Sequence, residues 1–128
     1  MVDYRLELND EQYGVVMEAG GPLLVIAGAG SGKTRTLTYR VTRLIDEGAD
    51  PGRILLATFT NKAARSMLGR VQTLLQQDVM HMWGGTFHHI AHWILRANAE
   101  RVGYDRQFSI IDAEDARQLM NTCLADKN

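Results

Sequence analysis

The sequence predicts an α/β fold in which helices flank a parallel sheet. Three apolar runs of strand length, residues 23–27, 54–59 and 82–87, each precede a segment with helical periodicity. A glycine-rich segment, residues 28–32, directly follows the first run and opens a helix. Strands that alternate with helices are typical of parallel sheets, because a crossover between parallel strands needs a long connection. Three strands are few for such a sheet, so we expect this chain to be the N-terminal part of a longer protein.

The first helix is predicted to begin after Asn9 and to end at residues 20–21, before Pro22. Asn9 fits the N-cap, and Gln12, three residues later, completes a capping box. Pro22 prevents the helix from continuing. The following run, residues 23–27, is apolar at every position, which favours a strand buried on both faces.

The second helix is predicted over residues 33–47, with Gly48 as its C-cap. The second strand covers residues 54–59, and a third helix follows it. The third strand covers residues 82–87, and a fourth helix follows it. The apolar residues that should face inward on these three helices are Leu37, Val41, Leu44 and Ile45, then Ala64, Met67, Leu68, Val71 and Leu75, then Ile90, Ala91, Ile94 and Leu95.

A short extended piece, residues 108–111, precedes a last helix that Asp112 can cap. The inward residues of this helix are predicted to be Ala116, Leu119, Met120, Cys123 and Leu124. We therefore expect Cys123 to be a small buried hydrophobe.

Composition excludes several classes of protein. Of the 128 residues, 45% are hydrophobic, which is enough for a packed core. The net charge of −1 provides no global basic field, so any contact with nucleic acid must come from a local surface. The single cysteine cannot form an internal disulfide, and the charged start lacks the apolar segment of a secretory signal. We expect a cytoplasmic protein that does not contact membranes.

The run Ala27-Gly28-Ala29-Gly30-Ser31-Gly32-Lys33-Thr34 predicts a phosphate-binding loop, or P-loop. Glycines let the backbone approach a polyphosphate closely, and the N–H groups at the helix start face the anion. Lys33 can reach the β- and γ-phosphates, and the Thr34 hydroxyl can ligate Mg²⁺. These two residues are the candidate catalytic residues, and Mg²⁺ and a nucleotide such as ATP are the expected ligands. Ala27 departs from the general pattern, which begins with glycine.

Hydroxyl and aromatic side chains follow the second and third predicted strands, in residues 58–64 and 84–88. Open α/β sheets place their ligand sites at the carboxyl ends of strands. Rings there can stack on the bases of single-stranded nucleic acid, although Phe59 and Phe87 by themselves favour core positions. Asn61 fits a helix N-cap equally well.

In order along the chain, these motifs resemble the UvrD/Rep family of superfamily 1 ATP-dependent DNA helicases. Residues 8–12 resemble the family's Q motif and residues 27–34 its motif I, in which alanine is common at the first position. Residues 54–67, centred on Thr58 to Ala64, resemble motif Ia. Residues 85–88, followed by 94–96, resemble motif Ib, and residues 108–112 resemble the entry to a helical insertion subdomain.

The resemblance implies a P-loop NTPase fold with a RecA-like parallel sheet, incomplete here. Residues 1–90 would be the N-terminal part of the first RecA-like ATP-binding domain, and residues 91–128 the start of the helical insertion subdomain. Gln12 would read the adenine edge and Arg35 would lie against the adenine ring. The alternatives are a purely capping Gln12 and a solvated helix arginine. The residues implied to line the single-stranded DNA path are Thr58, Phe59, Thr60, Asn61, Thr86 and His88.

The resemblance implies that the intact protein couples ATP hydrolysis to 3′–5′ movement on single-stranded DNA and to unwinding at duplex junctions. This chain lacks the family's Asp-Glu-x-Gln-Asp motif, so we expect it to be nearly inactive without the remainder of the helicase chain. An alternative is a nucleotide-dependent module that binds DNA or protein without unwinding. A small-molecule kinase fits poorly, because it has no use for residues 58–64.

Two further patterns suggest metal sites. Asp112 follows an apolar run, as a metal-binding acid does in many ATPases, but Ser109 interrupts that run and Asp112 also fits a helix cap. His88 and His92 are one helical turn apart, as in zinc protease helices. His89 stands where those helices have a glutamate base, so we interpret His92 as a helix-surface residue.

Overall fold

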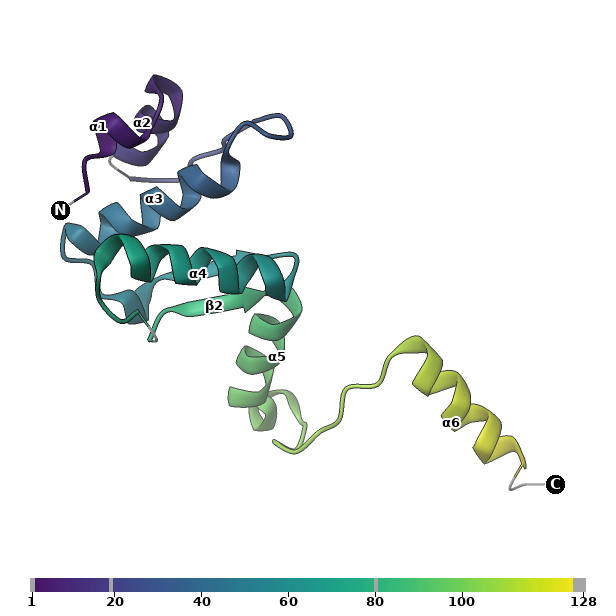
Figure 1. Cartoon of the computed structure of the whole chain (residues 1–128). Helices are drawn as coiled ribbons and strands as arrows, with labels where there is room; N and C mark the ends of the chain where they lie inside the picture. Colours follow the sequence, from purple (N-terminus) through teal and green to yellow (C-terminus); the bar gives the residue numbers. More distant parts are fainter. Residues whose placement is uncertain (1, 19, 80, 126–128) are drawn as a thin grey trace. The chain divides into compact units, whose positions relative to one another are not determined.

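The computed structural model describes residues 2–18, 20–79 and 81–125. It divides into two units, residues 1–91 and 92–128, each of which is considered by itself. Six α-helices, two 3₁₀ helices and two strands are found in the described ranges (Figure 1). Their bounds are α1 Tyr4–Glu7, α2 Asp10–Met17, α3 Lys33–Asp46, η1 Pro51–Arg53, β1 Leu55–Thr58, α4 Asn61–Leu75, β2 Trp83–Thr86, α5 Phe87–Ala97, η2 Ala99–Val102 and α6 Ala113–Ala125.

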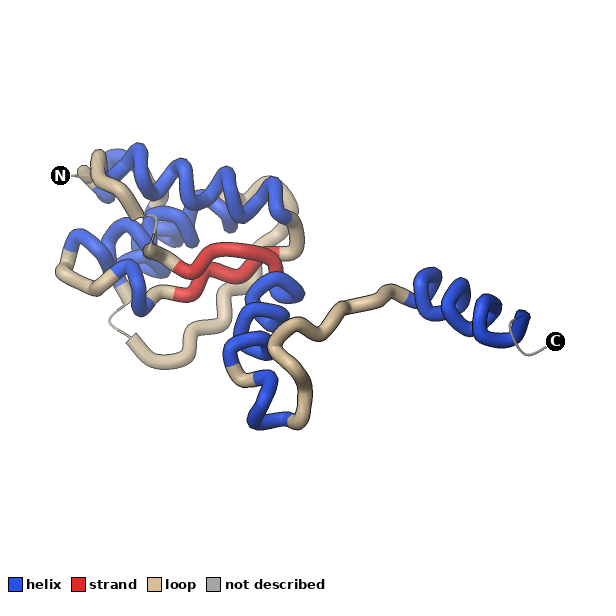
Figure 2. Tube along the Cα trace, turned by 90° about the horizontal axis from the view of Figure 1, so that it is seen from below, coloured by secondary structure: helices blue, strands red, loops and turns tan. Residues whose placement is uncertain are grey.

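The first unit is built around two parallel strands, β1 and β2, which pair from Leu55 opposite Trp83 to Thr58 opposite Thr86 (Figure 2). This pairing confirms the predicted α/β class and the parallel direction of the sheet. α4 connects the two strands and packs against both of them, α3 packs on α4, and α2 packs on α3. The core between these layers consists of Val41, Ile45, Leu56, Met67, Val71, Val79 and Met82.

The predicted helices α2, α3 and α4 are present, because strong local signals define their starts, but α2 ends at Met17 rather than at residues 20–21. Asn9 caps α2 and forms the predicted capping box with Gln12. α3 begins at Lys33, and Gly48 follows its end with the positive φ of 97° that a helix terminus favours. Thr60, and not Asn61, caps α4 by accepting a hydrogen bond from the Ala63 N–H at 3.1 Å.

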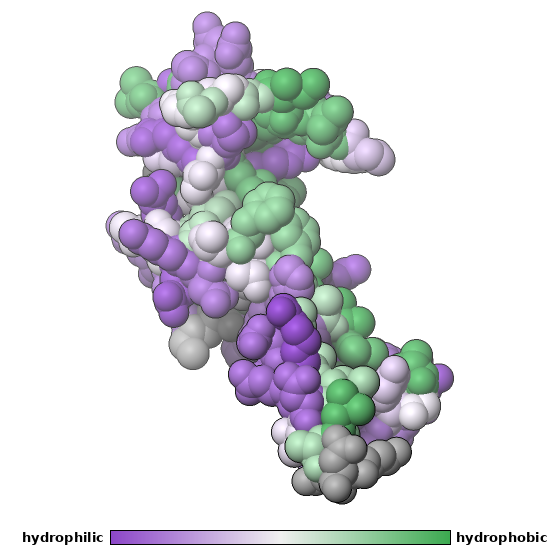
Figure 3. Space-filling model, turned by 90° about the vertical axis from the view of Figure 1, so that its right-hand side faces the viewer, coloured by the Kyte–Doolittle hydropathy of each residue, from purple (hydrophilic) through white to green (hydrophobic). Residues whose placement is uncertain are grey.

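The predicted first strand, residues 23–27, is wrong. These residues have no regular secondary structure, and their apolar side chains reach the surface, with Leu24 83% and Ile26 90% exposed. A parallel strand needs neighbours that take its backbone hydrogen bonds and layers that cover both faces. Within the part of the chain that the structure describes, β1 and β2 pair only with each other. The apolar side chains of residues 23–26 therefore remain open to solvent. The space-filling view shows that hydrophobic residues, in green, reach the surface on this side of the molecule (Figure 3).

The predicted burial of α6 is also wrong. Leu119, Met120 and Leu124 are 57–62% exposed, and Cys123 is exposed rather than buried. An amphipathic stripe becomes buried only when another element packs against it. Ile94 on α5 and Leu37 on α3 are exposed for the same reason. The prediction that Asp112 caps this helix is confirmed, because its carboxylate accepts hydrogen bonds from the Glu114 and Asp115 N–H groups at 2.8 and 2.9 Å.

In the second unit, Arg96 fixes the loop that follows α5. Its guanidinium donates to the carbonyls of Arg106 at 2.7 Å and Phe108 at 3.1 Å, and to the His92 ring nitrogen at 3.2 Å. The Phe108 ring lies 4.9 Å from the Arg96 Cζ and packs edge-on against the His92 ring. Residues 108–111, which were predicted to be extended, are loop without a strand partner.

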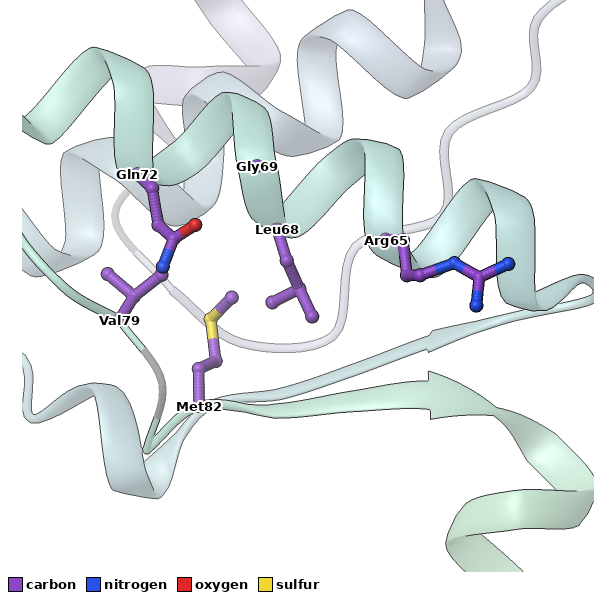
Figure 4. A pocket seen from close by; sticks show the side chains of 6 residues that line it. All are labelled: Arg65, Leu68, Gly69, Gln72, Val79 and Met82. Atoms are coloured by element: carbon purple, nitrogen blue, oxygen red, sulfur yellow. The ribbon is translucent and has the colours of Figure 1, made fainter.

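Close packing of α4 on β2 depends on Gly84. A Cβ at this position would lie 2.7 Å from Leu68 Cδ1, which is closer than two non-bonded carbon atoms can approach. Leu68 also lines a pocket of about 290 Å³ together with Val79 and Met82 (Figure 4). A side chain at position 84 would therefore force Leu68 out of its present position.

We expect Gly84→Ala to lower the free energy of unfolding by about 1–2 kcal/mol, because Leu68 must leave its packed position. Urea denaturation of the two proteins measures this difference. Gly69→Ala is the control, since a Cβ there meets nothing within 4 Å. That change lies inside α4 and should stabilise the helix by up to about 1 kcal/mol. Equal stability of Gly84→Ala and the wild type would show that Leu68 moves into the pocket at no cost.

Candidate nucleotide and nucleic-acid site

The P-loop, residues 27–34, leads directly into α3. Gly30 and Gly32 have φ values of 78° and 85°, in the left-handed region where a side chain is strained, and Gly32 is the N-cap of α3. A Cβ at Gly28 or Gly30 would meet nothing within 4 Å, so the face of the loop is open. The loop is also largely exposed, which leaves room for a polyphosphate.

Lys33 is turned back onto this loop. Its Nζ donates to the carbonyls of Ala27 at 3.0 Å and Gly28 at 2.5 Å. The Ser31 hydroxyl donates to the same Gly28 carbonyl at 2.8 Å. The ammonium group is thus placed at the loop, where a phosphate oxygen could replace the carbonyls as its acceptor. Thr34, the next residue, is exposed in the first turn of α3, so its side chain can be reached by a Mg²⁺ ion. These donors fit a magnesium–nucleotide complex.

Gln12 caps α2 and contacts the P-loop at the same time. Its amide oxygen accepts from the Asn9 N–H at 3.4 Å, and its amide nitrogen donates to the Ser31 carbonyl at 3.0 Å. A Cβ at Gly32 would lie 2.6 Å from that amide nitrogen. The capping position therefore places the Gln12 amide directly against the start of α3.

Arg35 is not a freely solvated arginine, because it forms hydrogen bonds with Glu7. Its Nη2 donates both to the backbone carbonyl and to the carboxylate of Glu7, each at 2.6 Å. The Tyr39 hydroxyl donates to the same carboxylate at 2.8 Å, and the Arg35 Cζ lies 5.0 Å from the Tyr39 ring centroid. Burial and the hydrogen bond to Glu7 raise the pKa of Tyr39 above its ordinary value.

Sequence reasoning missed Glu7 and the short helix α1 that carries it. A second contact ties α1 to α3, because the Tyr4 hydroxyl donates to the Asp46 carboxylate at 2.7 Å. Burial and this hydrogen bond raise the pKa of Tyr4. The sequence offers an N-cap signal for α1 in Asp3, whose carboxylate accepts from the Arg5 and Leu6 N–H groups. It offers no signal for the contact with Arg35, which is 28 residues away.

The second group of predicted residues lies where β1 and β2 end, side by side in the sheet. Thr58 is 8% exposed, and its hydroxyl donates to the Thr60 carbonyl at 3.0 Å and lies 3.5 Å from the Gly85 carbonyl. The Thr86 hydroxyl accepts from the His89 N–H at 3.2 Å, at the start of α5. Thr58, Thr60 and Thr86 therefore shape the two strand-to-helix turns, and Asn61 and His88 are exposed beside them.

Phe59 and Phe87 project from these two turns into solvent. Phe59 is 90% exposed and Phe87 is 51% exposed, so the preference of the sequence pattern for core positions is wrong. The ring centroids are 5.3 Å apart with a 60° angle between the planes. The sheet places the rings together, because Thr58 and Thr86, which precede them, are paired across β1 and β2. Two adjacent exposed rings provide a surface on which a flat base can stack.

His92 and Asp112, which belong to the two sequence patterns that suggested metal sites, contact other protein groups in the structure. His92 is half-buried and is held by Arg96 and Phe108, so it is more than a helix-surface residue. Asp112 caps α6. Among the residues that the structure describes, no group of three or more His, Cys, Asp or Glu side chains is placed to hold a metal ion. No helix in these ranges has the length and apolarity needed to cross a membrane.

The chain is similar in sequence to known helicases. The sequence profile of the UvrD/REP helicase N-terminal domain matches residues 8–128. The chain is 45% identical over 122 residues to a protein of Staphylococcus epidermidis named ATP-dependent DNA helicase PcrA. It is 46% identical over 122 residues to the PcrA helicase of Staphylococcus aureus strain Mu50. Each match covers 94% of this chain but only 17% of the relative, so the chain spans about a sixth of the length of these proteins. The profile match over nearly the whole chain, together with this identity, shows that the chain belongs to the UvrD/Rep helicase family.

Proposed function

We propose that this chain is the N-terminal ATP-binding part of an ATP-dependent DNA helicase or translocase. The intact protein would move 3′–5′ on single-stranded DNA and unwind the duplex at junctions. The observation that carries the proposal is that two features occur in the same unit. One is an open P-loop that Gln12 contacts, and the other is the pair of exposed rings, Phe59 and Phe87, at the carboxyl ends of β1 and β2. The PcrA relatives support it, because they are named ATP-dependent DNA helicases.

In this proposal, the P-loop and the start of α3 bind the phosphates of ATP. Lys33 exchanges the Ala27 and Gly28 carbonyls for phosphate oxygens, and Thr34 holds Mg²⁺. Gln12 reads the adenine edge and Arg35 lies against the ring. The bound Mg²⁺–ATP supplies the free energy of phosphoryl transfer, which the intact protein converts into movement.

The strand-end residues would contact the single strand. Phe59 and Phe87 are placed to stack on bases, and the exposed Asn61 and His88 can reach the phosphate backbone or base edges. The buried Thr58 would act by holding the turn that carries Phe59. We further propose that the rest of the protein covers the apolar residues 23–26 and supplies the acidic residues and second domain needed for hydrolysis.

We expect the 128-residue chain to bind ATP weakly and to hydrolyse almost none, whereas the full-length protein hydrolyses ATP when single-stranded DNA is added. Steady-state phosphate release by both proteins, with and without DNA, measures this. Unwinding of duplexes with a 3′ or a 5′ tail tests the direction. DNA-stimulated turnover by the 128-residue chain that Lys33→Ala removes would overturn the expected inactivity. ATP-dependent DNA binding without unwinding by the full-length protein would favour a binding module instead.

A further inference from the structure

Glu7 holds Arg35 in one orientation through two acceptors. Both the backbone carbonyl and the carboxylate of Glu7 accept from Arg35 Nη2 at 2.6 Å. Hydrogen bonds between two ionised groups are the stronger kind, and two acceptors on one residue restrict the rotation of the guanidinium plane. The ion pair is about half exposed, with side-chain exposures of 45% and 48%, so its contribution to folding stability is small.

The same carboxylate also fixes Tyr39, one helical turn beyond Arg35 on α3. The Tyr39 hydroxyl donates to Glu7 Oε2 at 2.8 Å, and the Tyr39 ring lies 5.0 Å from the Arg35 Cζ. Tyr39 is buried, with 6% of its surface exposed, and therefore supports the Arg35–Glu7 pair from the side of the core.

Arg35 and Gln12 border the same point at the start of α3. A Cβ built on Gly32 would lie 2.6 Å from the Gln12 amide nitrogen and 3.9 Å from the Arg35 Cβ. The amide that reads a base edge and the arginine that lies against the base plane are thus neighbours, next to the P-loop. The 45% exposure of Arg35 leaves part of its planar group available to a flat ligand.

We propose that Glu7 is a positioning residue for base recognition, which orients Arg35 so that its guanidinium stacks on the purine of the bound nucleotide. This inference rests on the proposed nucleotide site. Without the Glu7 carboxylate, Arg35 keeps only the backbone carbonyl of residue 7 as an acceptor and must lose more rotamer freedom when the nucleotide binds, which weakens affinity for the base. The phosphate contacts of Lys33 and the P-loop do not depend on Glu7.

Calorimetric titration of the full-length protein with Mg²⁺–ATP and with Mg²⁺–tripolyphosphate, which has no base, separates these contributions. We expect Glu7→Ala to weaken ATP binding about fivefold and to leave tripolyphosphate binding unchanged. Glu7→Gln keeps a neutral acceptor for Arg35, so its ATP affinity should lie between those of Glu7→Ala and the wild type. Tyr4→Phe is the matched control, because it removes the other side-chain tie between α1 and α3 without touching Arg35.

The outcomes distinguish this inference from the proposed function. Unchanged ATP affinity in Glu7→Ala, in a protein whose ATP binding depends on Lys33 and Arg35, would overturn the positioning role alone. A parallel loss of ATP and tripolyphosphate binding, shared by Tyr4→Phe, would show that Glu7 only stabilises the fold. ATP binding that Lys33→Ala does not affect would overturn the proposed nucleotide site and this inference with it.

Discussion

Lys33→Ala is expected to reduce DNA-stimulated ATP hydrolysis by the full-length protein about 100-fold or more. The Lys33 ammonium group is the positive charge that the structure places at the P-loop, through its contacts with the Ala27 and Gly28 carbonyls. Removal of one preorganised donor to a developing negative charge costs about 100- to 1,000-fold in rate. Steady-state phosphate release at saturating single-stranded DNA measures the effect, and unwinding should be lost in parallel.

Two controls separate this effect from a general loss of charge or of folding. Arg70→Ala removes an exposed cation from α4, away from the P-loop sequence, and should keep wild-type turnover. The single-stranded DNA affinity of Lys33→Ala without nucleotide should equal that of the wild type. Wild-type turnover in Lys33→Ala would contradict the assignment of residues 27–34 as the phosphate site.

Phe59→Ala is expected to weaken binding of single-stranded DNA by the full-length protein about tenfold. Stacking of a base on an aromatic side chain contributes about 1–3 kcal/mol, and Phe59 is 90% exposed beside the Phe87 ring. The ring makes few contacts inside the chain, so its loss should leave the free energy of unfolding nearly unchanged. Fluorescence anisotropy with a labelled oligonucleotide measures the affinity.

The substitution Phe59→Trp keeps a stacking surface and should retain most of the DNA affinity. Leu6→Ala, at an apolar residue of α1 that is 85% exposed, controls for the removal of exposed apolar surface. ATP binding without DNA should be the same in all these variants. A DNA affinity of Phe59→Ala equal to that of the wild type would place the single-strand path elsewhere on the protein.

Local sequence signals predicted the elements whose ends are determined by neighbouring residues. The capping box of Asn9 and Gln12, the glycine at the start of α3 and the Asp112 cap all lie where the pattern indicates. The same holds for β1, α4 and β2, and for the P-loop itself. The helix caps depend on hydrogen bonds between residues two to four positions apart, so the local sequence contains the information for them.

The predictions of buried residues were wrong for segments that need another element, far away in the sequence, to cover them. Residues 23–27 and the apolar stripe of α6 have the right composition for a core, yet they are exposed in the described structure. The helical periodicity of apolar residues, or a continuous apolar run, indicates which face of an element can be buried. That face becomes buried only when another element packs against it. Phe59 is a further example, since its aromatic side chain favours a core position and yet is 90% exposed.

The sequence by itself determined the family and, apart from the predicted strand at residues 23–27, the order of the α-helices and strands from α2 to α6, because short motifs and apolar patterns specify these locally. Only the tertiary structure showed that Gln12 contacts the P-loop, that Glu7 holds Arg35, and that Phe59 and Phe87 form one exposed pair. These contacts join residues 19 to 28 positions apart. Their geometry follows from how α1 and α2 pack on α3 and how β1 pairs with β2, which no local pattern encodes.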